Sequence, residues 1–205
     1  MIYRGRVNEF NTVLKAIKNR FDVPIIACFG NEEYDECIPS LIRNFSDEVG
    51  WLNDEYIKIK IKSFRLGIIG SRGSLDRPTK WQLKNIPNIK EIYAERVRKV
   101  EKLFNYIADC DFRILLLHYS PTYKTLIGED RRIWPELGCK RFEEVIVSRK
   151  PTIVIHGHAH RSKVFSTRIG ESKIFNVSLP AVRKIITFQL PLKTSYQAKL
   201  TSFFK

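Results

Sequence analysis

Apolar runs that are typical of buried strands alternate along the chain with segments of helical periodicity. Residues 24–29, 112–117 and 152–155 are almost entirely apolar, and runs of this length predict short strands buried on both faces of a parallel sheet. In 7–21 and 89–108, apolar residues recur at helical spacing with polar residues opposite them. The pattern predicts strands and helices in alternation, the order of an α/β domain.

Strands of a second kind are half-exposed. Residues 57–62 alternate isoleucine with lysine, which predicts a strand with one face in water, and 64–69 is its expected partner. Further strands are expected at 173–179 and 182–190, and a helix around 142–146. Doubly buried strands together with amphipathic ones predict a layered α/β fold with mixed sheets.

The composition fits a single globular domain. The chain has 205 residues, of which 43% are apolar and 28% charged. We expect one domain over 1–194 and a basic tail over 195–205. The apolar runs are far shorter than the roughly 20 residues that span a bilayer, and no secretory signal follows Met1, so no membrane partner and a cytoplasmic location are expected. The four cysteines include no Cys-x-x-Cys pair, which argues against a disulfide framework or a zinc ribbon.

The chain carries a large positive charge. Its 36 basic and 22 acidic side chains give a formal net charge of +14. Such a surplus attracts phosphate-bearing partners, among them nucleotides and nucleic acids. The same surplus is equally typical of a solvated, lysine-rich and arginine-rich surface, so charge alone names no function.

All four histidines lie directly after, or at the end of, predicted buried strands. His118 follows 112–117, and His156, His158 and His160 follow 152–155, while Asn31 comes just after 24–29. Because ligand sites of α/β folds collect at the carboxyl ends of the strands, these side chains are expected to converge above the sheet. Neutral imidazoles are good ligands for Zn²⁺, Mn²⁺ and Fe.

Each of these residues also has an ordinary structural interpretation. A histidine at a strand end is often a hydrogen-bonded loop residue, and Gly30-Asn31 is a common turn. A Gly-His-x-His segment together with His118 and Asn31, all at strand ends, favours a metal site over this interpretation.

Three segments resemble the third, fourth and fifth motifs of the calcineurin-like metallophosphoesterases. They are Gly30-Asn31-Glu32-Glu33, Leu117-His118-Tyr119-Ser120-Pro121 and Gly157-His158-Ala159-His160. The resemblance covers about 30–190. It implies a four-layer sandwich of two mixed sheets flanked by helices, and a dinuclear metal centre that hydrolyses phosphate esters with an activated water.

The resemblance also implies roles for single residues. Asn31, His118 and His158 match ligands of one metal, and His160 matches a ligand of the other. His156 matches no ligand position, which makes it a neighbour of the site. In much of the family a histidine after the motif asparagine protonates the leaving group, and this chain has Glu32 there. Because some branches without that histidine act on phosphodiesters, the resemblance favours diesters slightly over monoesters.

The first two motifs of the family, Asp-x-His and Gly-Asp, have no counterpart in this sequence, and residues 1–5 resemble the segment just after the second. We therefore expect a domain that is incomplete at its N-terminus and a chain whose catalysis is impaired. The absent ligands include the aspartate that bridges the metals. Two ions (Mn²⁺, Fe²⁺ or Zn²⁺) are expected in a complete site, and one or none in this chain.

Three functions compete on these observations. The favoured one is a metal-dependent phosphoesterase with a phosphate-ester substrate. The alternative is a catalytically degenerate scaffold or nucleic-acid-binding module on the same fold. A purely structural metal site fits less well, because structural zinc usually has four protein ligands with cysteines prominent.

Overall fold

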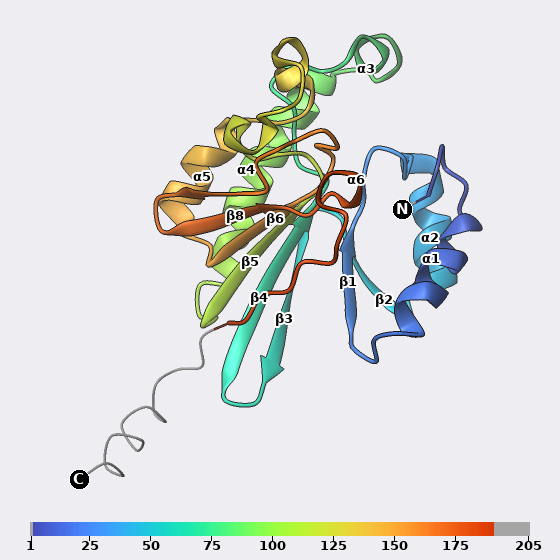
Figure 1. Cartoon of the computed structure of the whole chain (residues 1–205), viewed down its shortest axis with the longest axis vertical. Helices are drawn as coiled ribbons and strands as arrows, with labels where there is room; N and C mark the ends of the chain where they lie inside the picture. The colour runs from blue at the N-terminus through green and yellow to red at the C-terminus, as the bar shows by residue number, and fades with distance from the viewer. Residues whose placement is uncertain (1, 191–205) are drawn as a thin grey trace.

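The computed structural model describes residues 2–190 and shows four layers (Figure 1). Helices, a six-stranded sheet, a two-stranded sheet and a second pair of helices follow one another across the molecule. The layered α/β fold with two sheets is therefore confirmed. The predicted tail at 195–205 and the predicted domain end at 194 lie outside the described residues.

The large sheet is parallel at its centre and antiparallel at both edges. Parallel pairing joins β4 to β5, β5 to β6 and β6 to β8, while β3 and β7 pair antiparallel at the edges. The central strands therefore end at one edge of the sheet. In order across the sheet, the strands are β3 (Glu55–Ile61), β4 (Phe64–Ser71), β5 (Phe112–Leu117), β6 (Ile153–His156), β8 (Ser172–Asn176) and β7 (Ser166–Ile169).

Two helices cover the outer face of the large sheet. These are α4 (Ile89–Tyr106), which confirms the helix predicted at 89–108, and α5 (Arg141–Arg149). The helical spacing of Val100 and Phe104 brings both side chains onto the sheet, where they are almost fully buried with Leu115. Among residues 2–190 this is the largest of four hydrophobic clusters, and it fixes β5 and β6 in the middle of the fold.

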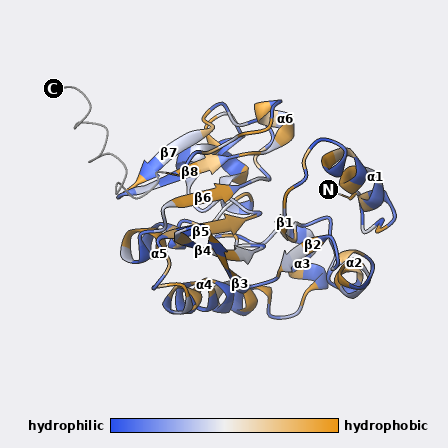
Figure 2. Cartoon of the chain, turned by 90° about the horizontal axis from the view of Figure 1, so that it is seen from below, coloured by the Kyte–Doolittle hydropathy of each residue, from blue (hydrophilic) through white to orange (hydrophobic). Residues whose placement is uncertain are grey.

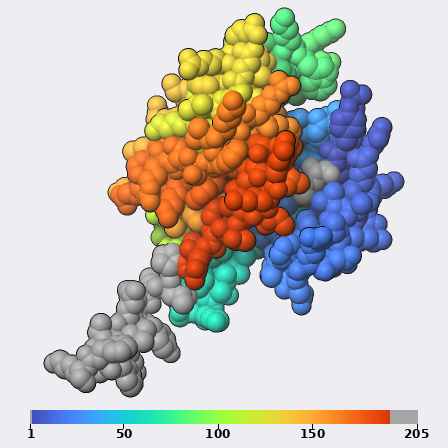
Figure 3. Space-filling model, viewed as in Figure 1, coloured from blue at the N-terminus to red at the C-terminus, as the bar shows by residue number. Residues whose placement is uncertain are grey.

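The small sheet faces the large one and carries its own helices. Its two strands, β1 (Ile25–Cys28) and β2 (Val49–Leu52), are parallel, and α1 (Glu9–Lys18) and α2 (Ile38–Phe45) pack on them. Gly70 of β4 has no side chain where Leu52 of β2 approaches, because a Cβ there would lie within 2.4 Å of Leu52 Cβ. In the space-filling view this N-terminal part forms one flank of the molecule (Figure 3, blue).

Short helical segments connect these layers. The helix α3 (Lys80–Asn85) stands at one end of the molecule, beyond the carboxyl ends of the central strands (Figure 1). The others are the turns η1 (Asp35–Cys37), η2 (Tyr123–Leu126) and η3 (Arg131–Glu136), and the short helix α6 (Leu179–Val182). Among residues 2–190 no helix combines the length and the apolarity that crossing a membrane requires.

The strand predicted at 182–190 is wrong. The segment begins at the end of α6 and then runs without strand pairing to residue 190. Both edges of β8 are already occupied by β6 and β7, so the segment has no backbone edge beside β8 to pair with. Its apolar residues pack instead, with the Phe188 ring 4.5 Å from that of Phe175 between centroids and Leu190 against the core between the sheets.

Candidate metal centre

The neighbouring strands β5 and β6 end side by side, and the histidines follow at this edge of the sheet. Leu117, the last residue of β5, pairs with His156, the last residue of β6. Beyond the strands the pairing continues, because the Gly157 backbone N–H donates to the His118 carbonyl at 3.2 Å. The loop that carries His158 and His160 therefore leaves the sheet directly beside His118.

Three predicted ligands meet above this edge. His118 Nε2 lies 2.6 Å from Asn31 Oδ1, and the His118 and His158 rings are 4.8 Å apart between centroids. The Tyr119 ring packs against both imidazoles, at 5.0 Å from His118 and 4.9 Å from His158. Asn31 therefore lies beside two of the four histidines, although it comes from a distant part of the chain.

The turn after β1 fixes the orientation of Asn31. Its amide nitrogen Nδ2 donates to Glu32 Oε1 at 3.2 Å, which leaves Oδ1 turned toward His118. The turn is closed by the Gly30 backbone N–H, which donates to Glu33 Oε2 at 2.7 Å. A Cβ on Gly30 would lie 2.8 Å from the His118 ring, so glycine permits this close approach.

His158 sits at the centre of a tight turn. The Ala159 N–H donates to the Gly157 carbonyl at 2.8 Å, two residues back, and His158 has a φ of 65°. A non-glycine residue in this left-handed region of a three-residue turn is strained, and such strain is concentrated at functional sites. This turn brings the His158 ring next to that of His118, whereas His160 lies on the exposed surface.

The other two histidines stand apart from this group. His160 is exposed, and its ring is 6.3 Å from that of His158. His156 is fully buried: Nδ1 donates to the Gly157 carbonyl at 2.9 Å, so in the neutral ring Nε2 accepts from the Thr125 hydroxyl at 2.8 Å. His156 therefore ties the histidine loop to η2 and has no nitrogen left for a ligand.

Both clustered imidazoles are neutral at ordinary pH. Desolvation by the surrounding protein lowers the pKa of His118 well below its ordinary value, and the neighbouring His158 and Arg72 lower it further. The same desolvation, with His160 close by, lowers the pKa of His158 to about 4. Neutral imidazole is the form that donates a lone pair to a metal.

The donor set fits one divalent ion better than two. Asn31 and His118 direct an amide oxygen and an imidazole nitrogen at each other, with His158 beside them, and this oxygen and nitrogen set suits Zn²⁺, Mn²⁺ or Fe²⁺. Among residues 2–190 no group of three or more His, Cys, Asp or Glu side chains is arranged to hold an ion. For a second ion the described part of the chain offers His160 without an acidic partner.

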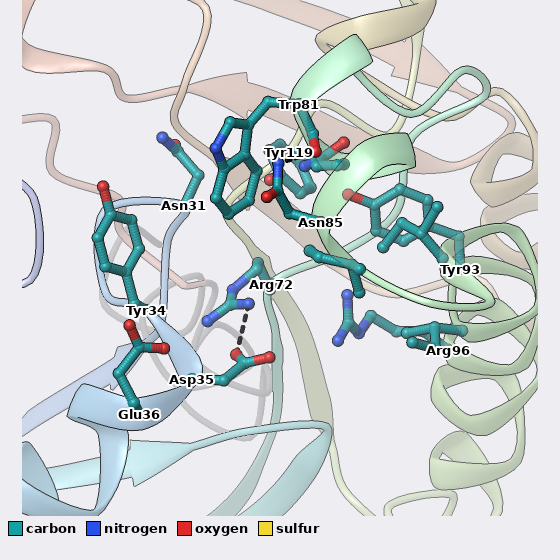
Figure 4. A pocket seen from close by; sticks show the side chains of 14 residues that line it. Asn31, Tyr34, Asp35, Glu36, Arg72, Trp81, Asn85, Tyr93, Arg96 and Tyr119 are labelled. Carbon is teal, nitrogen blue, oxygen red and sulfur yellow. Dashed lines mark hydrogen bonds and ion pairs between the residues drawn. The ribbon is translucent and has the colours of Figure 1, made fainter.

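Two adjoining cavities open beside the candidate site. They have volumes of about 350 and 310 Å³ and share Asn31, Tyr34, Trp81, Gln82 and Tyr119 in their walls. His158 lines the smaller cavity. The larger one lies between the turn that follows β1 and the helices α3 and α4, as Figure 4 shows.

Arg72 lies between the two walls of the larger cavity (Figure 4). Its Nη1 donates to Asp35 at 2.8 Å and its Nη2 to the Glu33 carbonyl at 2.7 Å, so it fastens the turn that carries Asn31 to the end of β4. Arg72 is not among the site residues predicted from the sequence. Its position just after a strand, in Gly70-Ser71-Arg72-Gly73, is the signal that could have revealed it.

The sequence and the fold were compared with those of known proteins. The family model of the calcineurin-like phosphoesterases matches residues 1–162. No curated protein matches the chain. Sulfate thiohydrolase SoxB of Thermus thermophilus, in complex with glycerol, is similar at 14% identity and a TM-score of 0.50, over 87% of this chain and 30% of that one. A putative 5′-nucleotidase from Staphylococcus aureus, in complex with alpha-ketoglutarate, is similar at 11% identity and a TM-score of 0.50, over 83% and 33%.

A further solved structure, at 12% identity and a TM-score of 0.53, covers 84% of this chain, which in turn spans 63% of that one. At such identities these likenesses concern the fold alone. The family model, in contrast, matches most of the sequence and includes all three segments that hold the clustered residues. The chain therefore belongs to the calcineurin-like phosphoesterase family.

Proposed function

We propose that this chain is a metal-dependent phosphoesterase in which Asn31, His118 and His158 hold one divalent cation. The observation that carries the proposal is the approach of His118 Nε2 to Asn31 Oδ1 at 2.6 Å, across 87 residues of sequence and beside His158. We assign His160 to a second ion, which it would hold weakly because one protein ligand is too few. Mn²⁺, Fe²⁺ and Zn²⁺ all suit these donors.

When bound, a divalent cation polarises a phosphoryl oxygen and lowers the pKa of a bound water. The residues of this chain supply position and electrostatics. Glu32 and Arg72 hold the turn of Asn31 in place, and Tyr119 packs against the imidazoles so that their rings keep one orientation. Such supporting contacts typically change metal affinity by about 10- to 100-fold when they are removed.

We propose phosphodiesters as the preferred substrate class. Glu32 occupies the position of the usual proton donor, and both of its oxygens accept hydrogen bonds: Oε2 from the Arg4 backbone N–H at 2.8 Å and Oε1 from Asn31 Nδ2 at 3.2 Å. Because both oxygens hold the turn in this way, we assign Glu32 a positioning role and not that of a proton donor. The absence of the usual histidine at this position is shared with family branches that act on phosphodiesters, and it supports this substrate class.

The test combines metal binding with hydrolysis. We expect the protein to bind Mn²⁺ in a titration followed by electron paramagnetic resonance, and His118→Ala and Asn31→Ala to weaken binding by more than about 100-fold. Asn44→Ala, an exposed residue of α2, is the matched control and is expected to bind normally. With Mn²⁺, bis(para-nitrophenyl) phosphate is expected to be hydrolysed faster than para-nitrophenyl phosphate. Equal Mn²⁺ binding by the His118 variant would refute the assignment.

One alternative function is a nucleic-acid-binding module with a degenerate site. The formal net charge of +14 favours it, as does the lack of a carboxylate-containing metal cluster in residues 2–190. It predicts retention of single-stranded or duplex DNA that weakens steeply between low and high salt, without cleavage in any of the three metals. Cleavage of the diester substrate by the protein, abolished in the His118→Ala variant, would exclude it.

A further inference from the structure

The larger cavity has aromatic side chains on two opposite walls. Tyr34 comes from the turn after β1, and Trp81 comes from α3 on the other side (Figure 4). Trp81 is 62% exposed, although tryptophan is among the residues that proteins usually bury most. Within residues 2–190 neither ring packs against another aromatic ring. Each ring can therefore present to a flat ligand the side that lines the cavity.

The wall that carries Trp81 is held in a defined geometry. The Thr79 hydroxyl accepts from the Gln82 backbone N–H at 3.2 Å, and the Gln82 side chain accepts from the Thr79 N–H at 2.9 Å. This reciprocal cap fixes the first turn of α3. Asn85 donates from Nδ2 to the Trp81 carbonyl at 2.8 Å and closes the other end. The exposed Trp81 side chain is therefore carried by a helix whose two ends are fixed by hydrogen bonds.

The space between these walls is lined by groups that can bind polar ring edges. Arg72 and Arg96 contribute guanidinium groups, and each is anchored by a carboxylate, Asp35 or Asp54. Asp35 and Glu36 also line the cavity and can accept hydrogen bonds from an amino group. A volume of about 350 Å³ is within the usual range of about 300 to 1,000 Å³ for ligand sites.

The cavity adjoins the candidate metal centre. Asn31 lines both cavities and lies 2.6 Å from His118, and Trp81 and Tyr34 also line both. A phosphate at the metal centre would therefore have the two aromatic walls within reach of the group esterified to it. A base attached to the sugar has a flat π-face that can stack on these rings, which a sugar lacks.

We infer that this cleft binds the nucleobase of a nucleotide phosphate ester, with the ring between Trp81 and Tyr34 and the phosphate toward Asn31 and His158. The inference rests on the proposed phosphoesterase function and names its substrate class. Because Asp35 and Glu36 are acceptors, a base with an exocyclic amine is the preferred occupant. Adenosine monophosphate, the product that hydrolysis of an adenine-nucleotide diester would leave, is the suitable probe.

The test compares two probes that differ only in the base. Adenosine monophosphate and ribose phosphate are titrated calorimetrically into the Mn²⁺-loaded protein and into the metal-free protein. Adenosine monophosphate is expected to bind about 5- to 150-fold more tightly, the range that a base stacked on an aromatic side chain gives. Trp81→Ala and Tyr34→Ala are expected to remove this difference while ribose phosphate binds as before. Trp81→Phe keeps a ring and is expected to retain most of it.

Tyr106→Ala is the matched control, because Tyr106 is also an exposed aromatic residue, at 57%, and lies at the far end of α4. It is expected to leave both affinities unchanged. Equal binding of the two probes, or an adenosine preference that survives in both alanine variants, would overturn the inference while leaving the phosphoesterase proposal intact. Failure of the protein to bind Mn²⁺ would instead count against the phosphoesterase proposal, and the adenosine preference would then be judged in the metal-free titration.

Discussion

Replacing Gly30 by alanine tests whether the approach of the β1 turn to His118 sets the geometry of the site. The added Cβ would lie 2.8 Å from His118 Cε1 and Nδ1 and 2.9 Å from Glu33 Oε2. Ordinary contact begins at 3.4 Å, so the imidazole must retreat by about 0.6 Å. This overpacking costs about 1 to 3 kcal/mol, and the loss of glycine entropy in the unfolded chain offsets about 0.4 to 1 kcal/mol of it.

We therefore expect Gly30→Ala to lower the free energy of unfolding by about 0.5 to 2 kcal/mol, or the melting temperature by roughly 1 to 8 °C. Because metal sites tolerate shifts of only about 0.2 Å, Mn²⁺ affinity should fall at least about tenfold. Gly157→Ala is the matched control: it also adjoins the site, but a Cβ there meets nothing within 4 Å. Urea denaturation and Mn²⁺ titration measure both effects. Equal stability and affinity for the two variants would refute the reasoning.

Three further predictions concern the surroundings of the site. Asp54→Asn is expected to cost about 1 to 3 kcal/mol in urea denaturation, because Asp54 pairs with Arg96 at 3.1 Å and both side chains are only 14% exposed; stability equal to wild type would contradict this. His156→Ala should cost about 2 to 4 kcal/mol by cavity formation and lost hydrogen bonds, whereas His160→Ala should stay within about 0.5 kcal/mol. Burial raises the pKa of Cys28 to about 12, so at pH 8 iodoacetamide should modify this thiol about a thousandfold more slowly in the native protein than in urea, as mass spectrometry would measure.

The clustered residues could be found from the sequence because their positions follow from local patterns. An apolar run that ends abruptly marks the carboxyl end of a buried strand, and parallel strands end at one edge of a sheet. That reasoning placed Asn31, His118 and His158 at one edge, and the structure brings them together. The isolated position of His156 was also predictable, because the motif skips it.

Other parts depend on contacts that no local pattern reveals. The sequence pattern does not predict β7, because three of the four residues Ser166–Ile169 are polar and the strand conformation depends on pairing with β8. It also missed α2 and α3; in α3 no residue is buried, and a capping box rather than an apolar stripe defines the helix. The cavity wall at Trp81 and the bridge made by Arg72 arise only when distant segments pack together.

The pairing of Leu117 with His156 has a consequence for how this site can change through evolution. Neighbouring strands stand about 4.8 Å apart, and each residue advances the chain by about 3.3 Å and reverses the side it faces. Adding or deleting one residue inside β6 would therefore displace the whole histidine segment relative to its neighbour and turn it over. Changes of length should be tolerated in the connections beyond His160, and the distance between the His118 and His158 imidazoles should be inherited unchanged wherever the two strands keep their alignment.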